Sequence, residues 1–143
     1  MHQDRPYWIR KEVIPTIFSV WIALEDMSEE NGGLILSRRN EVDAADISAF
    51  NTGAILAHQE VVDSSGTFPL LIPDKIASAL AKSMEFIDMA KGEAVAFDSF
   101  EPHMSRANTT SSPRIAMKIA YAEGDGKAHY LTRVDDLERN DAR

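Results

Sequence analysis

Hydrophobic and polar residues alternate along several short stretches of the chain. In residues 15–25, PTIFSVWIALE, an extended chain places two sets of side chains on opposite sides, namely Phe18, Val20, Ile22 and Leu24 against Ser19, Trp21 and Ala23. Residues 114–122 alternate in the same way, and residues 53–63 and 93–100 are further short β-like runs. A period of two residues is typical of β-strands. The pattern therefore predicts that most of the chain forms short strands.

Turn signals separate these strands. The tripeptide Asn31-Gly32-Gly33 follows the first strand, in a place where positive φ is easily adopted, and an apolar run resumes directly after it. We therefore expect a β-hairpin at this point. Residues 38–52 are polar and irregular and predict a loop.

One helix is predicted among the strands, over residues 73–86, PDKIASALAKSMEF. Pro73-Asp74 is a helix start signal, and Ile76, Leu80 and Met84 recur every four residues. The resulting apolar stripe should pack on a sheet. Many short strands with a single helix favour a mainly β fold with a closed or sandwiched antiparallel sheet, such as a jelly roll.

Composition and charge exclude several classes of function. The chain has 143 residues, enough for one domain, and no apolar run approaches the roughly 20 residues that span a bilayer. It contains no cysteine, which removes disulfides and thiolate ligands and favours a cytoplasmic setting. The formal net charge of -8 disfavours nucleic acid as a partner. We therefore expect neither nucleic acid nor membrane as a partner, and we look for a small-molecule site inside the domain.

Three residues with metal-binding side chains are the first candidates for chemistry. His2 and Asp4 can point to the same side of an extended segment, because residues i and i+2 do so. A third ligand is needed, and the best candidate is His103, which follows an apolar strand and precedes a polar turn. Two histidines and one carboxylate on one face of an octahedral ion are the ligands of non-haem iron(II), and they leave positions open for substrate and oxygen.

Arg114 adds a cation near this candidate centre. It lies eleven residues after His103, and if residues 103–107 and 114–121 pair antiparallel it falls near Ala107. That position is about 13 Å along the strand from His103. A guanidinium that leans back towards the metal can bind the far carboxylate of a small dicarboxylate through two parallel hydrogen bonds, while the other end of the molecule chelates the ion.

Four segments, HQD...YW, SVWIALEDMSEENGGL, FDSFEPHMSRANTTSSPR and KIAYAEGD, resemble the phytanoyl-CoA dioxygenase family in the family's order and over nearly the whole chain. Members are iron(II)- and 2-oxoglutarate-dependent oxygenases built on a double-stranded β-helix of the jelly-roll type. The resemblance implies that His2, Asp4 and His103 ligate iron, and that Arg114 binds the distal carboxylate of 2-oxoglutarate. With dioxygen, it implies hydroxylation of an unactivated C–H bond in a small organic substrate.

The resemblance also implies roles for residues around the centre. Ser105 and Trp21 match positions that line the cosubstrate pocket, and Tyr7 and Trp8 match an aromatic stretch near the substrate entrance. Further substrate contacts are expected in the loop of residues 38–51 and in residues 68–71.

The front of the chain departs from the family pattern. Members usually carry a long N-terminal portion before the HQD segment, so we expect the chain to be truncated, with Met1 either an internal methionine or a misassigned start. Residues 1–131 would then be the C-terminal portion of the oxygenase domain, and residues 132–143 a charged tail. Loss of the N-terminal portion would leave an apolar sheet face partly uncovered, which favours a homo-oligomer.

Plainer interpretations of the same residues stay open. Without the resemblance, His2 and His103 are typical of surface and loop histidines, Asp4 of a first-turn carboxylate, and Arg114 of an exposed strand-end charge. Trp21 could belong simply to the core. Two functional alternatives therefore remain: a non-catalytic β-barrel module that binds a small ligand, and an inactive truncated remnant of the oxygenase.

Overall fold

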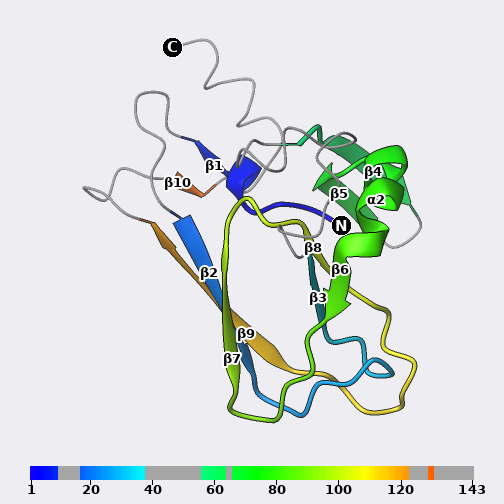
Figure 1. Ribbon diagram of the computed structural model, residues 1–143, viewed down its shortest axis with the longest axis vertical. Coiled ribbons are helices and arrows are strands. Elements are labelled where there is room, and N and C mark those ends of the chain that lie inside the picture. The colour runs from blue at the N-terminus through cyan, green and yellow to red at the C-terminus, as the bar shows by residue number, and fades with distance from the viewer. Residues whose placement is uncertain (10–16, 38–55, 64–65, 123–128, 131–143) are drawn as a thin grey trace.

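The computed structural model describes residues 1–9, 17–37, 56–63, 66–122 and 129–130. Short strands dominate this part of the chain (Figure 1). The strands are β1 (Trp8–Ile9), β2 (Ile17–Ala23), β3 (Leu34–Ser37), β4 (Gln59–Asp63), β5 (Gly66–Leu71), β6 (Met84–Phe86), β7 (Ala94–Asp98), β8 (His103–Ser105), β9 (Ala116–Ala122) and β10 (His129–Tyr130). The helical elements are η1 (Arg5–Tyr7), α2 (Asp74–Leu80) and η3 (Ala81–Ser83). The predicted loop at 38–52 and the predicted tail at 132–143 lie outside the described residues.

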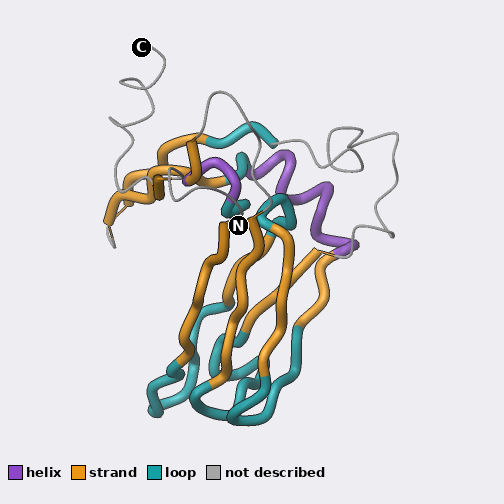
Figure 2. Tube along the Cα trace, turned by 90° about the vertical axis from the view of Figure 1, so that its left-hand side faces the viewer, coloured by secondary structure: helices purple, strands orange, loops and turns teal. Residues whose placement is uncertain are grey.

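Two antiparallel three-stranded sheets form the body of the molecule. Their strand orders are β7-β2-β9 and β6-β3-β8, and two smaller pairs, β4-β5 and β1-β10, lie at one end (Figures 1 and 2). The main core lies between the two large sheets, where Ala23 and Phe97 from one sheet pack with Leu34 and Leu36 from the other. The prediction of a mainly β protein with sandwiched antiparallel sheets is confirmed.

The alternation predicted for residues 15–25 corresponds to β2, and it determines which side chains face the core. Ile17, Ser19 and Ala23 are buried, whereas Phe18 on the opposite face is 41% exposed. Residues directly opposite each other on neighbouring strands share a face, so Trp21 and its partner Lys118 on β9 also lie on the inner side. The inner face of this sheet therefore carries polar side chains.

The turn predicted at residues 31–33 is present, but the predicted hairpin is wrong. Gly32 has φ of +82°, and a Cβ added there would lie 2.3 Å from the carbonyl oxygen of Arg106, so the position requires glycine. The turn leads from β2 into β3, and these strands belong to different sheets. β2 cannot pair with β3 because both of its edges are already occupied, by β7 and by β9.

The predicted helix is shorter than expected. The α-helix covers Asp74–Leu80 and is followed by the 3-10 turn η3, whereas residues 84–86 form β6 and pair with β3. Pairing with β3 thus overrides the helical period at Met84. Leu80 is fully buried and packs with Leu56 and Ile72. None of the described helices is long and apolar enough to cross a membrane.

The pairing predicted between residues 103–107 and 114–121 is also wrong. β8 pairs with β3, and β9 pairs with β2, so the two segments lie in different sheets. The turn between them therefore crosses from one sheet to the other. Arg114 lies just before β9, so it is beside the sheet opposite the one that contains His103.

Candidate metal centre

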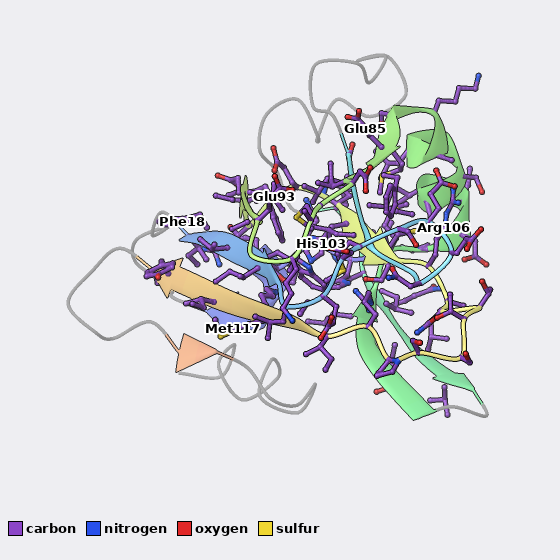
Figure 3. All side chains as sticks on the ribbon, turned by 90° about the horizontal axis from the view of Figure 1, so that it is seen from below. Phe18, Glu85, Glu93, His103, Arg106 and Met117 are labelled. Carbon is purple, nitrogen blue, oxygen red and sulfur yellow. The ribbon has the colours of Figure 1, made fainter. Side chains whose placement is uncertain are left out.

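His2 and His103 lie side by side, although they are about a hundred residues apart in the sequence. Their main chains form an antiparallel bridge in which each backbone N–H donates to the other residue's carbonyl, at 3.0 and 2.9 Å. Their ring centroids are 4.2 Å apart. Figure 3 shows His103 in the interior of the molecule, away from Phe18 and Met117. The edge of β8 thus fixes the position of the first residues of the chain.

Asp4 completes a group of three metal-binding side chains. Its Oδ1 lies 3.7 Å from Nε2 of His2 and 3.5 Å from Nε2 of His103. One ligand atom from each of the three residues lies within 4.8 Å of the others. The structure therefore brings together the three residues that the sequence analysis singled out as ligands.

Two neighbouring side chains contact the Asp4 carboxylate. Ser19 on β2 donates a hydrogen bond from Oγ to Oδ2 at 2.5 Å, and Lys118 on β9 donates from Nζ to Oδ1 at 2.5 Å. Asp4 itself is only 1% exposed. Ser19 and Lys118 therefore belong to the centre, although the sequence analysis assigned no role to either.

Local hydrogen bonds, burial and neighbouring charges determine the protonation of the three side chains. Nδ1 of His103 donates to the carbonyl of Glu101 at 3.0 Å, which in the neutral ring leaves the Nε2 lone pair free. Burial lowers the pKa of His2 and so favours its neutral form. Burial alone would raise the pKa of Asp4, but the imidazoles of His103 and His2, when they carry a proton on Nε2, and the charge of Lys118 hold this pKa well below its usual range. A bound metal ion would take the place of those protons. An anionic oxygen and two imidazole nitrogens thus face a common point, which suits a divalent metal ion.

Gln3 holds the segment that carries His2 and Asp4. It is fully buried, its Nε2 donates to the carbonyl of Phe100, and its Oε1 accepts from the backbone N–H of Leu56. The backbone N–H of Gln3 donates to Nε2 of His58 at 3.3 Å. The segment is therefore attached to two other parts of the chain.

Arg114 and Trp21 lie together on the inner side of the β7-β2-β9 sheet. The Arg114 guanidinium carbon is 5.6 Å from the centre of the Trp21 ring. Within the described residues, Nη1 of Arg114 and Nε1 of Trp21 are buried donors without a hydrogen-bond partner. Buried donors are nearly always paired, so two such donors side by side suit an anionic group supplied by a ligand.

The remaining predicted site residues are Ser105, Tyr7 and Trp8. Ser105 ends β8 on the same side of the strand as His103, and it is exposed. The backbones of Tyr7 and Trp8 lie in η1 and β1, but the predicted roles of their side chains lie outside what the structure describes.

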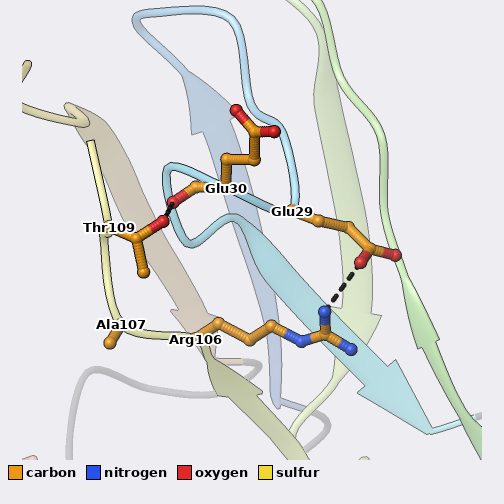
Figure 4. A pocket seen from close by; sticks show the side chains of 5 residues that line it. All are labelled: Glu29, Glu30, Arg106, Ala107 and Thr109. Carbon is orange, nitrogen blue, oxygen red and sulfur yellow. Dashed lines mark hydrogen bonds and ion pairs between the residues drawn. The ribbon is translucent and has the colours of Figure 1, made fainter.

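An open pocket of about 440 Å³ lies beyond β8 (Figure 4). Arg106 there donates to Glu29 at 2.7 Å, and Thr109 donates to the carbonyl of Glu30 at 2.8 Å. Because these polar groups already bond to one another, the pocket is a weaker candidate than the group around Asp4.

Comparisons with known proteins identify a family and a fold. The family model of phytanoyl-CoA dioxygenase (PhyH) matches residues 1–116. Among solved structures, the chain resembles EvdO2 from Micromonospora carbonacea var. aurantiaca complexed with 2-oxoglutarate, with a TM-score of 0.59 and 22% identity. A second structure of EvdO2 gives a TM-score of 0.56 and 21% identity. Each match covers 92% of this chain and 46% of the other, so this chain spans less than half the length of EvdO2. No curated protein matches the chain.

Proposed function

The chain belongs to the phytanoyl-CoA dioxygenase (PhyH) family, and from this membership we propose that it carries the metal and cosubstrate site of an oxygenase that hydroxylates an unactivated C–H bond of a small organic substrate. The chemistry of this family depends on iron(II), 2-oxoglutarate and dioxygen. The observation that carries the proposal is the convergence of His2, Asp4 and His103 on one point.

His2, Asp4 and His103 would hold the iron through two imidazole nitrogens and one carboxylate oxygen. Bound iron(II) and 2-oxoglutarate supply the activation of dioxygen that attack on an inert C–H bond requires. The protein itself holds the three metal-ligand side chains in position. Ser19 orients the Asp4 carboxylate through a hydrogen bond to Oδ2, and the hydrogen bond from Nδ1 of His103 to the Glu101 carbonyl would leave Nε2 of that ring to hold the metal.

Arg114 and Trp21 would bind the distal carboxylate of 2-oxoglutarate. The two buried donors without partners support this role, because a carboxylate accepts two hydrogen bonds and neutralises the guanidinium. Ser105 could add a third hydrogen bond, and Tyr7 and Trp8 would lie on the substrate side. We further propose that residues 1–131 act as the C-terminal portion of the oxygenase domain and residues 132–143 as its tail.

The proposal is tested by calorimetric titration of 2-oxoglutarate into the chain with and without Mn(II), a redox-stable substitute for iron(II). We expect binding only when Mn(II) is present. Arg114→Ala should weaken it about tenfold or more, because one charge-assisted contact is lost. Arg106→Ala, which removes an exposed arginine paired with Glu29, is the matched control and should bind normally.

Three outcomes would contradict the proposal in different ways. Binding of 2-oxoglutarate without metal would favour the non-catalytic binding module. Failure of the folded chain to bind Mn(II) would favour the inactive remnant. Equal affinities for 2-oxoglutarate in Arg114→Ala and Arg106→Ala would remove Arg114 from the site.

A further inference from the structure

Lys118 places an ammonium group directly at the candidate metal centre. It lies on the inner face of β9, opposite Trp21 on β2, and its Nζ is 2.5 Å from Oδ1 of Asp4. Its neighbours on the same face, two residues away in each direction, are Ala116 and Ala120. These small side chains leave the lysine stem uncovered, and 27% of the Lys118 side chain is exposed. The ammonium therefore lies beside the centre, on a side chain that is partly accessible from outside it.

The oxygen that Lys118 contacts is the same one that faces the two imidazoles. Oδ1 of Asp4 lies 3.5 Å from Nε2 of His103 and 3.7 Å from Nε2 of His2. A divalent ion bound to that oxygen repels an ammonium group on it. The flexible four-carbon stem of a lysine allows the ammonium to turn aside. Among the described residues Asp4 is the only carboxylate that pairs with Lys118, so the displaced ammonium needs a different anion.

The formal charges of the site with the ion and 2-oxoglutarate bound indicate whether 2-oxoglutarate can supply that anion. The ion, Arg114 and Lys118 would together carry four positive charges, whereas Asp4 and a 2-oxoglutarate dianion carry three negative ones. The distal carboxylate of 2-oxoglutarate has its own donors in Arg114 and Trp21, which are buried. Lys118 lies four residues further along the chain, about 13 Å from Arg114 if the strand is fully extended. One positive charge, on the accessible side, thus remains unbalanced.

We propose that Lys118 is a substrate-binding residue that selects molecules with a monoanionic oxyanion group, such as a sulfonate or carboxylate, close to the carbon that is oxidised. The inference rests on the function proposed above and adds the class of substrate. Because the Lys118 ammonium reaches an atom of the metal ligand Asp4, an anion bound to it lies within a few bonds of the reacting carbon. A lysine suits this role because it offers a mobile point charge.

The test uses the full chain loaded with Mn(II) and saturated with 2-oxoglutarate. Methanesulfonate is the probe, and uncharged dimethyl sulfone, which has nearly the same shape, is its control. Mn(II) shortens the proton relaxation times of methyl groups that bind near it, so NMR relaxation reports weak binding at the centre. We expect selective relaxation of methanesulfonate. Lys118→Met should reduce this effect about tenfold, and Lys118→Arg should retain it.

Two further measurements separate this inference from the proposed function. Lys118→Met should bind Mn(II) at least as tightly as the parent chain, because no ammonium competes for Oδ1 of Asp4, and its affinity for 2-oxoglutarate should be unchanged. Lys91→Met, at an exposed lysine paired with Glu25, is the matched control and should behave as the parent chain does.

Equal relaxation of methanesulfonate in the parent chain and Lys118→Met would overturn the inference while leaving the proposed function intact. A loss of affinity for 2-oxoglutarate in Lys118→Met would also overturn it, by assigning Lys118 to the cosubstrate. If the parent chain binds no Mn(II), the proposed function fails first, and the inference fails with it.

Discussion

The two faces of the β7-β2-β9 sheet differ in a way that the pattern of apolar residues does not suggest. The outer face carries large apolar side chains that remain exposed, among them Phe18, Met117 and Tyr121 at 41%, 43% and 47%. The inner face carries Ser19, buried and bonded to Asp4, and Lys118. The more polar face of the sheet is therefore the one directed at the candidate centre.

This difference shows that alternation in a strand identifies two faces but not their roles. A serine or lysine on an inner face is costly unless it has a partner, and here both have the same one, the Asp4 carboxylate. Large apolar groups on the outer face cost less individually, although together they form a patch that favours contact with other protein surfaces. The homo-oligomer predicted from the sequence stays a prediction. Substitutions on each face can test whether the two roles are separate.

The largest effect is expected from Asp4→Ala. It removes the only anionic ligand and leaves Lys118 and Ser19 without their shared partner, so affinity for Mn(II) should fall more than about a hundredfold. Calorimetric titration with Mn(II) measures the change. Asp88→Ala, at an exposed aspartate, is the control. Retained Mn(II) binding in Asp4→Ala would show that the metal binds elsewhere.

A smaller effect is expected from Ser19→Ala on the inner face. Loss of the hydrogen bond to Oδ2 of Asp4 should lower the affinity for Mn(II) by about 10- to 100-fold, because it frees the ligand to rotate. The same titration applies, with circular dichroism to confirm folding. If Ser19→Ala and a Phe18→Ser substitution on the outer face weaken metal binding equally, the inner face has no special role in metal binding.

Lower pH should destabilise the chain through two partly buried histidines. Burial lowers the pKa of His58 and His2, so the unfolded chain binds protons first as pH falls. The penalty is absent above about pH 6.5, the ordinary pKa of histidine, grows as pH falls from there towards the lowered pKa values of the folded state, and is constant below them. Urea unfolding at pH 7.5 and 5.5, roughly one unit either side, measures the loss. His58→Gln should reduce it, and an unchanged pH dependence would contradict the stated cause.

The smallest effect is expected on the outer face. The rings of Phe18 and Tyr121 stack with centroids 5.0 Å apart, and such a pair contributes about 0.5–1.5 kcal/mol beyond its buried area. A double-mutant cycle with Phe18→Ser and Tyr121→Ser should therefore show coupling of about 1 kcal/mol or less in urea unfolding. Neither substitution should alter affinity for Mn(II), and a change there would mean that the faces are coupled.

The sequence predicted some features of this molecule because they depend on local chemistry. The alternation at β2 and β9 identified strands, and Gly32 identified a turn that only glycine fits. Strand pairing was predicted incorrectly, because it depends on which strands occupy each edge, and that is decided by distant residues. The predicted helix was too long because residues 84–86 pair with β3, which is distant in the sequence.

The candidate site was partly predictable in the same sense. Side-chain chemistry marked His2, Asp4, His103 and Arg114 as candidates and the family resemblance implied their roles, and the structure brings the first three together. Ser19 and Lys118 were missed because a lone serine or lysine in a strand is usually a solvent-facing residue. The available signal was their place in the alternation, since each lies between small or apolar residues on one face.

The main-chain bridge between His2 and His103 has a thermodynamic consequence for a bound ion. Joining two ligands across a ring of about a hundred residues would cost a free chain roughly 4 kcal/mol of entropy. The two backbone hydrogen bonds close this ring before any ion arrives, so the fold and not the ion bears that cost. Unfolding should then open the bridge and release the metal in one cooperative event, and a chelator should lower the denaturant concentration at which the chain unfolds.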